Sequence, residues 1–234
     1  AVQAAVDAAA DGDTIYLCEG TYAIGAPITY TSKSLTLQGV RAGLTVLDGD
    51  TTSALVSAPS DALIVSGLTF VNGHAEEAAS GGAILVDDLT VSASYFAGNS
   101  AGLWGGAIYA VTAATVTSSV FEMNGANVGG AINADSGTID SSLFITNSAD
   151  FGGGAITTSS AIVVTSTAFR GNGASGAGGA IAAGDAIVAS SVFADNETTG
   201  DLGGAVYSGT ATVTSSLFSS NEATTNAGGA VNAE

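Results

Sequence analysis

Short stretches in which apolar and polar residues alternate recur along the chain, as in "TVTSSVF" and "TIDSSLF". Each is too short for a typical helix, and its Val, Ile, Thr and Phe residues favour β-strands. In the first stretch Val116 and Phe121 are five residues apart, so a straight strand would point their side chains to opposite faces. Both side chains face one core only if the chain bends near Ser118–Ser119. The same bend is predicted at Ser141–Ser142, Ser190–Ser191 and Ser215–Ser216.

Two motifs alternate with these strands, and the first gives the chain a period of 24 or 25 residues. Gly-Gly-Ala followed by Ile or Val begins at Gly81, Gly105, Gly129, Gly153, Gly178, Gly203 and Gly228. After a degenerate copy at Phe70, the motif Phe-x-x-Asn occurs at Phe96/Asn99, Phe121/Asn124, Phe144/Asn147, Phe169/Asn172, Phe193/Asn196 and Phe218/Asn221. A period of this length with two or three short strands predicts one turn of a solenoid, in which each residue lies above its equivalent in the next coil.

Stacked coils give each repeated residue a structural role. We predict an interior column of phenylalanine rings and a column of asparagine amides that exchange hydrogen bonds from coil to coil. The paired glycines are predicted at a corner where backbone conformation or close approach excludes a side chain. The repeated Phe, Asn and Gly residues are therefore the predicted structural ladders of the fold.

The first part of the chain lacks the repeat. Alanine-rich residues 1–12, with Val2 and Val6 four apart and a stop at Asp11-Gly12, predict a short helix that caps the solenoid. Residues 13–69 predict less regular coils and residues 70–234 the repeat coils, so that 1–234 form a single domain. The predicted fold is all-β, a right-handed parallel β-helix of about ten coils with a short N-terminal capping helix. The sequence stops early in another repeat, which predicts an open coil end that stacks end to end on a second copy.

Composition narrows the class of partner. The chain has 21 acidic residues against Lys33, Arg41 and Arg170, for a formal net charge of −18, although only 10% of its residues are charged. Nucleic acid and anionic membrane surfaces attract clustered cations, so neither is an expected partner. No apolar run reaches the ~18 residues of a membrane span, so direct membrane insertion is not expected. The single cysteine, Cys18, lies in an apolar strand-like run and is predicted to be a buried small hydrophobe.

The opening "QAAVDAAADGDTIYLCEGTY" resembles the start of right-handed parallel β-helix domains of the pectin-lyase-like superfamily. The alternation of Gly-Gly-Ala-[Ile/Val] with Phe-x-x-Asn resembles the polymorphic outer-membrane protein repeats of chlamydial adhesins and other bacterial surface proteins. This resemblance covers nearly all of the chain. It implies a secreted or surface-displayed stalk, often adhesive, in which the repeat residues are structural.

Pectin-lyase-like proteins also include polysaccharide lyases and hydrolases. The resemblance implies a Lys or Arg base and acid-bound calcium in a lyase, and clustered aspartates in a hydrolase. The basic residues of this chain are dispersed, and the one adjacent aspartate pair, Asp87-Asp88, is predicted to be a solvated turn. His74, beside Glu76 and Glu77, is predicted in an exposed loop rather than in a metal site. No catalytic, cofactor or metal-ligating residue is therefore expected.

Calcium is only weakly indicated. The segments 11–13 and 48–50, both Asp-Gly-Asp, have turn chemistry that could hold the ion. Asp87, Asp135 and Asp185 share a rough register, but the intervening coils lack the acid that a calcium-binding repeat would need.

Two further binding surfaces have weak signals. A flat outward array of Thr-x-Thr would indicate ice binding, but "AIVAS" from Ala186 breaks the array. The Thr-x-Thr triplets lie at Thr115–Thr117 and Thr212–Thr214, with a related run at Thr165–Thr167. Trp104 and Phe151 precede Gly-Gly-Ala motifs and are expected to form an apolar edge rather than a sugar-binding platform.

The predicted function is a non-catalytic, extracellular or cell-surface structural or adhesive β-helix, serving as an adhesin stalk or as a subunit of a head-to-tail fibre. The alternative is a polysaccharide-active or carbohydrate-binding β-helix. The expected partners are a second copy of the chain, a host or cell-surface ligand, or a glycan.

Overall fold

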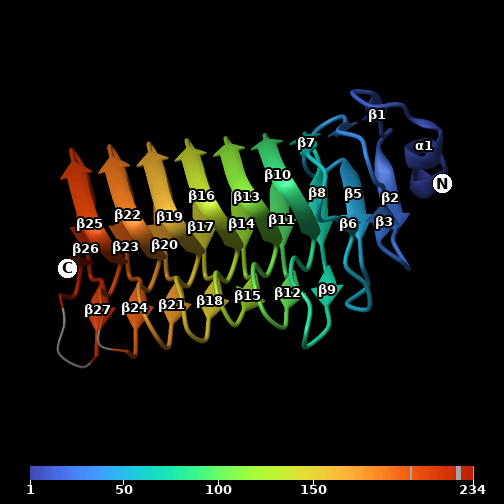
Figure 1. Cartoon of the computed structure of the whole chain (residues 1–234). Coiled ribbons are helices and arrows are strands. Elements are labelled where there is room, and N and C mark those ends of the chain that lie inside the picture. The colour runs from blue at the N-terminus through green and yellow to red at the C-terminus, as the bar shows by residue number, and fades with distance from the viewer. Residues whose placement is uncertain (201, 225–227, 234) are drawn as a thin grey trace.

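The computed structural model describes residues 1–200, 202–224 and 228–233. The chain winds into a parallel β-helix whose coils lie side by side along one axis, with the N-terminal helix at one end (Figure 1). Each regular coil contributes one strand to each of three parallel sheets, which we call sheets A, B and C. The predicted fold class is confirmed, with about nine coils rather than about ten, because sheet B has nine strands within the described residues.

The strands of the described residues divide among the three sheets as follows. Sheet A has the order β1 (Thr14–Tyr16), β4 (Leu35–Gln38), β7 (Leu63–Ser66), β10 (Ile84–Ser92), β13 (Ile108–Thr117), β16 (Ile132–Asp140), β19 (Ile156–Thr165), β22 (Ile181–Ala189), β25 (Val206–Thr214) and β28 (Val231–Ala233), with β3 (Ile28–Thr29) and β6 (Val56–Ala58) beside them. Sheet B contains β2 (Gly20–Ala23), β5 (Thr45–Asp48), β8 (Thr69–Val71), β11 (Tyr95–Ala97), β14 (Val120–Glu122), β17 (Leu143–Ile145), β20 (Ala168–Arg170), β23 (Val192–Ala194) and β26 (Leu217–Ser219). Sheet C contains β9 (His74–Ala75), β12 (Ser100–Ala101), β15 (Gly125–Ala126), β18 (Ser148–Ala149), β21 (Gly173–Ala174), β24 (Glu197–Thr198) and β27 (Glu222–Ala223).

Parallel pairing in register places equivalent residues above one another. Val116 on β13 pairs with Ile139 on β16, and Phe121 on β14 pairs with Phe144 on β17. One coil therefore corresponds to one sequence repeat, as the motif spacing predicts. The inward side chains of the coils form one continuous hydrophobic core along the axis.

The predicted bend between sheets A and B is confirmed at the serine pairs. Left-handed backbone angles, with φ of 49° to 51°, occur at Ser118, Ser141, Ser190 and Ser215. The next residue turns inward: the buried Ser119 hydroxyl donates to the Thr117 carbonyl at 2.8 Å and accepts the Ser94 N–H at 3.1 Å. A left-handed residue followed by an inward hydroxyl thus lets Val116 and Phe121 face the same core.

The helix α1 (Val2–Ala8) covers the first coil (Figure 1). Val2 and Val6 are buried in the core cluster, as their four-residue spacing predicts. The Gln3 side-chain amide pairs with β3 much as another strand would. Its Nε2 donates to the Thr29 carbonyl and its Oε1 accepts the Thr29 N–H, both at 2.8 Å. The outer edge of the first coil is therefore partly covered by a side chain.

The helix ends at Ala8, before the predicted stop at Asp11-Gly12. Ala9 is already extended, and Lys33 Nζ donates to the carbonyls of Val6 and Ala9 at 2.6 and 2.9 Å. Gly12 donates its N–H to the Ser34 carbonyl at 2.8 Å. The segment after Ala8 is thus bonded to the neighbouring coil, and these contacts replace a further helical turn.

Cys18 is exposed, so the prediction of a buried thiol is wrong. The strand period of two explains the difference. Ile15 and Leu17 are buried, which leaves the side chains that alternate with them on the outer face. Within the described residues no helix has the length and apolar character needed to cross a bilayer. Glu234, the last residue of the predicted repeat segment 70–234, lies outside the described residues.

Candidate functional site

Phenylalanine rings form one column inside the helix. Successive ring centroids are 4.7 to 4.9 Å apart, and no two neighbouring rings are tilted by more than 9°. The column contains Phe70, Phe96, Phe121, Phe144, Phe169, Phe193 and Phe218. All except Phe218 are fully buried. The strand spacing of ~4.8 Å sets this face-to-face stacking, because each ring is attached to the same position of its own coil.

The repeated asparagines form a second column. Asn99 Nδ2 donates to Asn124 Oδ1 at 3.0 Å, and the same oxygen accepts the Asn99 backbone N–H at 3.1 Å. Equivalent amide-to-amide bonds of 2.8 to 2.9 Å continue through Asn147, Asn172, Asn196 and Asn221. The second N–H of each amide donates to a phenylalanine carbonyl, as from Asn99 to Phe70 at 3.1 Å. The ladder therefore satisfies backbone groups that the corner between sheets B and C would leave unpaired.

The two positions of each glycine pair require glycine for different reasons. The first has a left-handed φ of 58° to 68° at Gly81, Gly105, Gly129, Gly178 and Gly203. Gly153 does not have this conformation, but a Cβ there would meet the Ile156 carbonyl of its own coil. The second glycine excludes a side chain by close approach, since a Cβ on Gly130 would meet the carbonyl oxygen of Gly154 in the next coil. Gly228 lies in the last described coil, and a Cβ there would meet the Val231 carbonyl at 2.6 Å.

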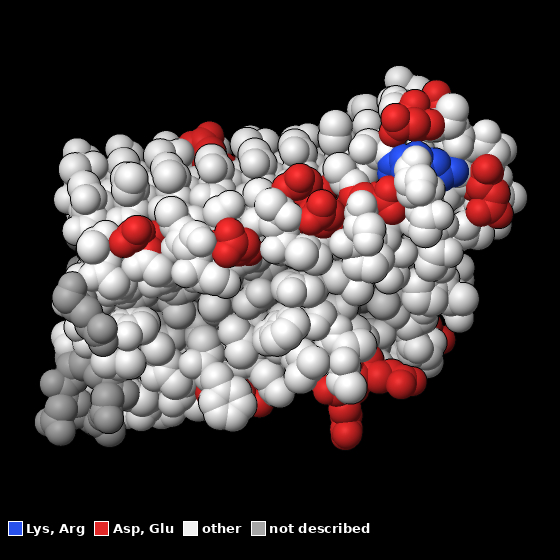
Figure 2. All heavy atoms as spheres, viewed as in Figure 1, with Lys and Arg blue, Asp and Glu red and all other residues white. Residues whose placement is uncertain are grey.

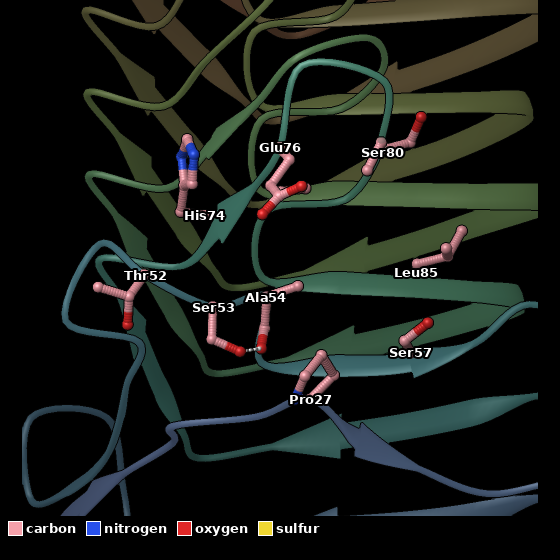
Figure 3. A pocket seen from close by; sticks show the side chains of 11 residues that line it. Pro27, Thr52, Ser53, Ala54, Ser57, His74, Glu76, Ser80 and Leu85 are labelled. Carbon is pink, nitrogen blue, oxygen red and sulfur yellow. Dashed lines mark hydrogen bonds between the residues drawn. The ribbon is translucent and has the colours of Figure 1, made fainter.

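A surface pocket of about 340 Å³ lies where the irregular coils meet the repeat coils (Figure 3). Its lining is rich in hydroxyl groups and includes Thr52, Ser53, Ser57, His74, Glu76 and Ser80. The Ser53 hydroxyl donates to the Ala54 carbonyl at 2.8 Å. The pocket offers hydroxyl, imidazole and carboxylate groups as polar contacts.

His74 lies in β9 and is half-buried, so the prediction of an exposed loop is wrong for this residue. Its Nδ1 is 2.9 Å from Ser100 Oγ in the next coil, which fixes the ring by a contact between coils. The loop begins one residue after β9, where Glu76 and Glu77 are exposed. Within the described chain, Glu76 forms no hydrogen bond with His74, so the two do not make an acid–base pair.

Asp87-Asp88 does not form the predicted turn. Both residues lie inside β10, at the register shift where β10 pairs with β13. Because the coil on β13 carries an additional residue at this point, the strand is irregular and both carboxylates stay accessible. Asp87 accepts a hydrogen bond from Thr112 in the next coil at 2.5 Å.

The aspartates in the same register each bind a hydroxyl from the following coil. Asp135 accepts from Ser160 at 3.1 Å, and Asp185 accepts from Thr210 at 2.6 Å. Hydroxyl residues in alternate coils keep the carboxylates apart, and Figure 2 shows acidic residues dispersed over this face. Among the described residues, no three His, Cys, Asp or Glu side chains come together as a metal site would need.

Within the described part of the chain, three titratable groups have a pKa that departs from its ordinary value. Burial, with a smaller effect of the Asp61 charge, raises the pKa of Tyr30 well above its usual value. Burial, followed by the hydrogen bond to Glu122, raises the pKa of Tyr95 to about 12. Hydrogen bonds from the Thr165 and Ser141 hydroxyls lower the pKa of the half-buried Asp140 carboxyl. None of these groups belongs to the pocket beside His74.

The structure also shows where the predicted threonine array and the predicted apolar edge of aromatic residues lie. The segment AIVAS interrupts the threonine array as predicted, since Ile187 pairs with Thr212 and is 51% exposed. Val163, which pairs with Thr138 and Ile187, interrupts the same column one coil earlier. Trp104 is 42% exposed and its ring lies 5.3 Å from that of Tyr109, whereas Phe151 is 68% exposed. These aromatic side chains lie in different coils and do not form a continuous platform.

Sequence reasoning missed a second polar ladder at the bend between sheets A and B. Its hydroxyls, all buried except the half-buried Ser216, donate to a carbonyl two residues earlier and accept an N–H from the preceding coil. The members are Ser94, Ser119, Ser142, Thr167, Ser191 and Ser216. Their recurrence directly after the left-handed position is a signal that the sequence contains.

Residues 93–111 match the model of the Chlamydia polymorphic membrane protein repeat. The match spans the segment from the bend before β11 to the middle of β13, which includes one Phe-x-x-Asn and one Gly-Gly-Ala-Ile motif. No curated protein and no solved structure has a significant match to the chain. The chain is thus a parallel β-helix that carries a repeat of the chlamydial type.

Proposed function

We propose that the chain is a non-catalytic structural module of an extracellular or cell-surface protein, and that its sides act in adhesion. The observation that carries the proposal is the unbroken stack of rings from Phe70 to Phe218, which ties the coils into one rod. The chlamydial-type repeat at residues 93–111 supports a place at the cell surface. A rod of stacked coils suits a stalk, because each coil is supported mainly by its two neighbours.

The outer face of sheet A is the adhesive surface that we favour. One column on this face is uncharged through successive coils and consists of Thr90, Thr115, Thr138, Val163, Ile187 and Thr212. Thr138 and Ile187 are both exposed. The column itself is uncharged, although Asp88, Asp135 and Asp185 lie beside it on strands of the same sheet. A regular uncharged column on a chain of net charge −18 can approach another surface with less repulsion than a column of carboxylates.

End-to-end stacking is a less favoured mode of assembly. The helix α1 covers the first coil, and the Gln3 amide already bonds to the backbone of β3. A second copy could pair with that edge only if the helix moved away. We therefore propose that the module acts through its sides, with a host-cell or glycan surface as partner.

Adhesion can be tested with beads that carry the purified protein. We expect the beads to bind cultured epithelial cells or an arrayed glycan. The double variant Thr138→Lys/Ile187→Lys should bind at least about tenfold less, because an unpaired charge buried at the interface costs more than ~1.4 kcal/mol of binding free energy. Ser219→Lys, on the exposed outer face of sheet B, is the matched control and should bind as the parent does.

Two results would contradict the proposal. Turnover of acidic or neutral polysaccharides, seen as new reducing ends or unsaturated products, would make the chain an enzyme. Equal binding by beads with the parent protein, the double variant and no protein would remove the adhesive role.

A further inference from the structure

The outer face of sheet B contains a hollow of about 540 Å³ beside the bend between sheets A and B. Its walls come from an irregular coil on one side and from the first repeat coils on the other. The lining includes Arg41, Gly43, Thr69, Ala93, Tyr95 and Val120. The hollow is separate from the pocket at His74, with which it shares no lining residue.

The repeat pattern changes at this place. The left-handed position of the bend is serine in the later coils, but it is Ala93 here and Gly67 one coil earlier. Tyr95 occupies the sheet B column that continues as Val120, Leu143, Ala168 and Val192. Ala93 therefore removes one bend hydroxyl from the hollow, although Ser118 of the next coil still lines it, and the Tyr95 ring beside Val120 makes its floor apolar.

The wall that carries Arg41 is held in place by hydrogen bonds. The Arg41 carbonyl accepts the Leu44 N–H at 3.1 Å, and the Gly43 N–H donates to the Thr69 hydroxyl at 2.8 Å. A Cβ on Gly67 would lie 3.3 Å from the Arg41 Cα, so the two backbones are in close contact. The hollow is thus formed by ordered backbone before any ligand binds.

Charge selects the kind of ligand. The chain has three basic residues against 21 acidic ones. Lys33 is used to bind the carbonyls at the end of α1, whereas Arg41 is exposed and forms no ion pair with any described residue. A free guanidinium beside an apolar floor complements a molecule that has one carboxylate and an apolar body.

We infer that this hollow binds a small amphipathic anion, an alkyl or aryl monocarboxylate, with its carboxylate on Arg41 and its apolar body over Tyr95 and Val120. The Tyr95 hydroxyl donates to Glu122 at 2.5 Å, which holds the ring in position as the floor of the site. Burial of the apolar body supplies the affinity, and Arg41 selects the anion.

The test is a titration of the full chain with octanoate, followed by calorimetry and by amide chemical shifts. We expect saturable binding with a Kd of about 1 mM, since a ligand of this size gains roughly 0.4 kcal/mol per heavy atom. Arg41→Gln should weaken binding by about tenfold, the loss of one charge-assisted contact. Tyr95→Ala should weaken it by at least about fivefold through lost apolar contact.

The matched control is Arg170→Gln, which removes the exposed arginine on β20 of the same sheet outside the hollow. This variant should bind octanoate as the parent does. The circular dichroism spectrum of each variant must match that of the parent, and Tyr95→Phe provides a milder change if Tyr95→Ala fails to fold.

Several outcomes would overturn the inference. Absence of saturation, equal binding of octyltrimethylammonium, or an Arg41→Gln variant that binds octanoate normally would each exclude an anion site. Binding of an oligogalacturonide with dependence on Arg41, without binding of octanoate, would replace the proposed ligand class by an acidic glycan.

Discussion

The repeat coils and the coils that precede them use the same parallel pairing but fill their interiors differently. From Phe70 onward, each coil adds an identical ring and, from Asn99, an identical amide to columns that run along the axis. The earlier coils contain aliphatic side chains instead, such as the fully buried Leu55 and Leu47, of which Leu47 occupies the position that pairs with Phe70. Their turns also differ in length from coil to coil.

This difference separates two contributions to the fold. Backbone pairing is sufficient to hold a coil in the stack, because β2 and β5 pair in register without any repeated motif. Identical side chains add contacts that are made only when the repeated residues of neighbouring coils are in register. The repeats therefore enforce a period, whereas the early coils tolerate loops such as the one that carries Arg41.

The largest effect is expected for removal of a ring from the middle of the stack. Phe144→Ala should lower the free energy of unfolding by about 3–5 kcal/mol through the cavity that it leaves. Its two stacked neighbours also lose ring contacts, so the loss should exceed that of Leu47→Ala in the early coils by about 1 kcal/mol. Urea unfolding followed by circular dichroism measures both values. An equal or smaller loss for Phe144→Ala would show that the stack adds nothing beyond buried area.

A smaller effect is expected for a break in the amide column. Asn147→Ala leaves the Asn124 backbone N–H and the Phe121 carbonyl without partners inside the coil, at a cost of about 3 kcal/mol. The comparison is Asn72→Gly in the degenerate first copy. The half-buried Asn72 has a left-handed φ of 53°, and its amide makes one bond, to Asp48 at 3.0 Å. The free energy of unfolding of that variant should fall by less than about 1.5 kcal/mol. A similar loss in both variants would mean that the column is no stronger than an isolated hydrogen bond.

The smallest effect is expected at the glycine corner. Gly130→Ala places a Cβ against the Gly154 carbonyl, and the coils must move apart at a cost of about 1–3 kcal/mol. Gly25→Ala in the early coils meets nothing within 4 Å and should be neutral or slightly stabilising. Thermal melting of the two variants beside the parent gives the comparison. The close-approach explanation fails if Gly130→Ala melts at the parent's temperature.

Sequence reasoning predicts the repeat coils well because one period determines every column. The five-residue spacing of Val116 and Phe121 is enough to place the bend, and the left-handed Ser118 supplies it. Phe121 and Phe144 pair in register although they are 23 residues apart and Phe144 and Phe169 are 25 apart, because register shifts in sheet A absorb the difference in coil length.

The repeat period could not predict features that depend on the irregular coils or on local register shifts. Cys18 lies in an apolar run, but only the inward placement of Leu17 shows that the thiol faces out. His74 and Asp87 have loop-like neighbours in the sequence, yet both lie in strands. His74 pairs with Ser100 of the next coil, and the Asp87 N–H donates to the Asp61 carbonyl of the preceding coil. The hollow at Arg41 and Tyr95 combines residues from different coils whose separation does not follow the period.

The amide column has a direction. Each Oδ1 from Asn124 to Asn221 accepts from the amide of the preceding coil, and each Nδ2 from Asn99 to Asn196 donates to the amide of the following coil. The backbone N–H of Gly73 donates to Asn99 Oδ1 at 2.8 Å, and because an N–H cannot accept, the first amide is unable to flip. Aligned amide dipoles reinforce one another along the rod. A coil added with the opposite chain direction would bring donor against donor, so the column can be continued only by a chain that runs the same way.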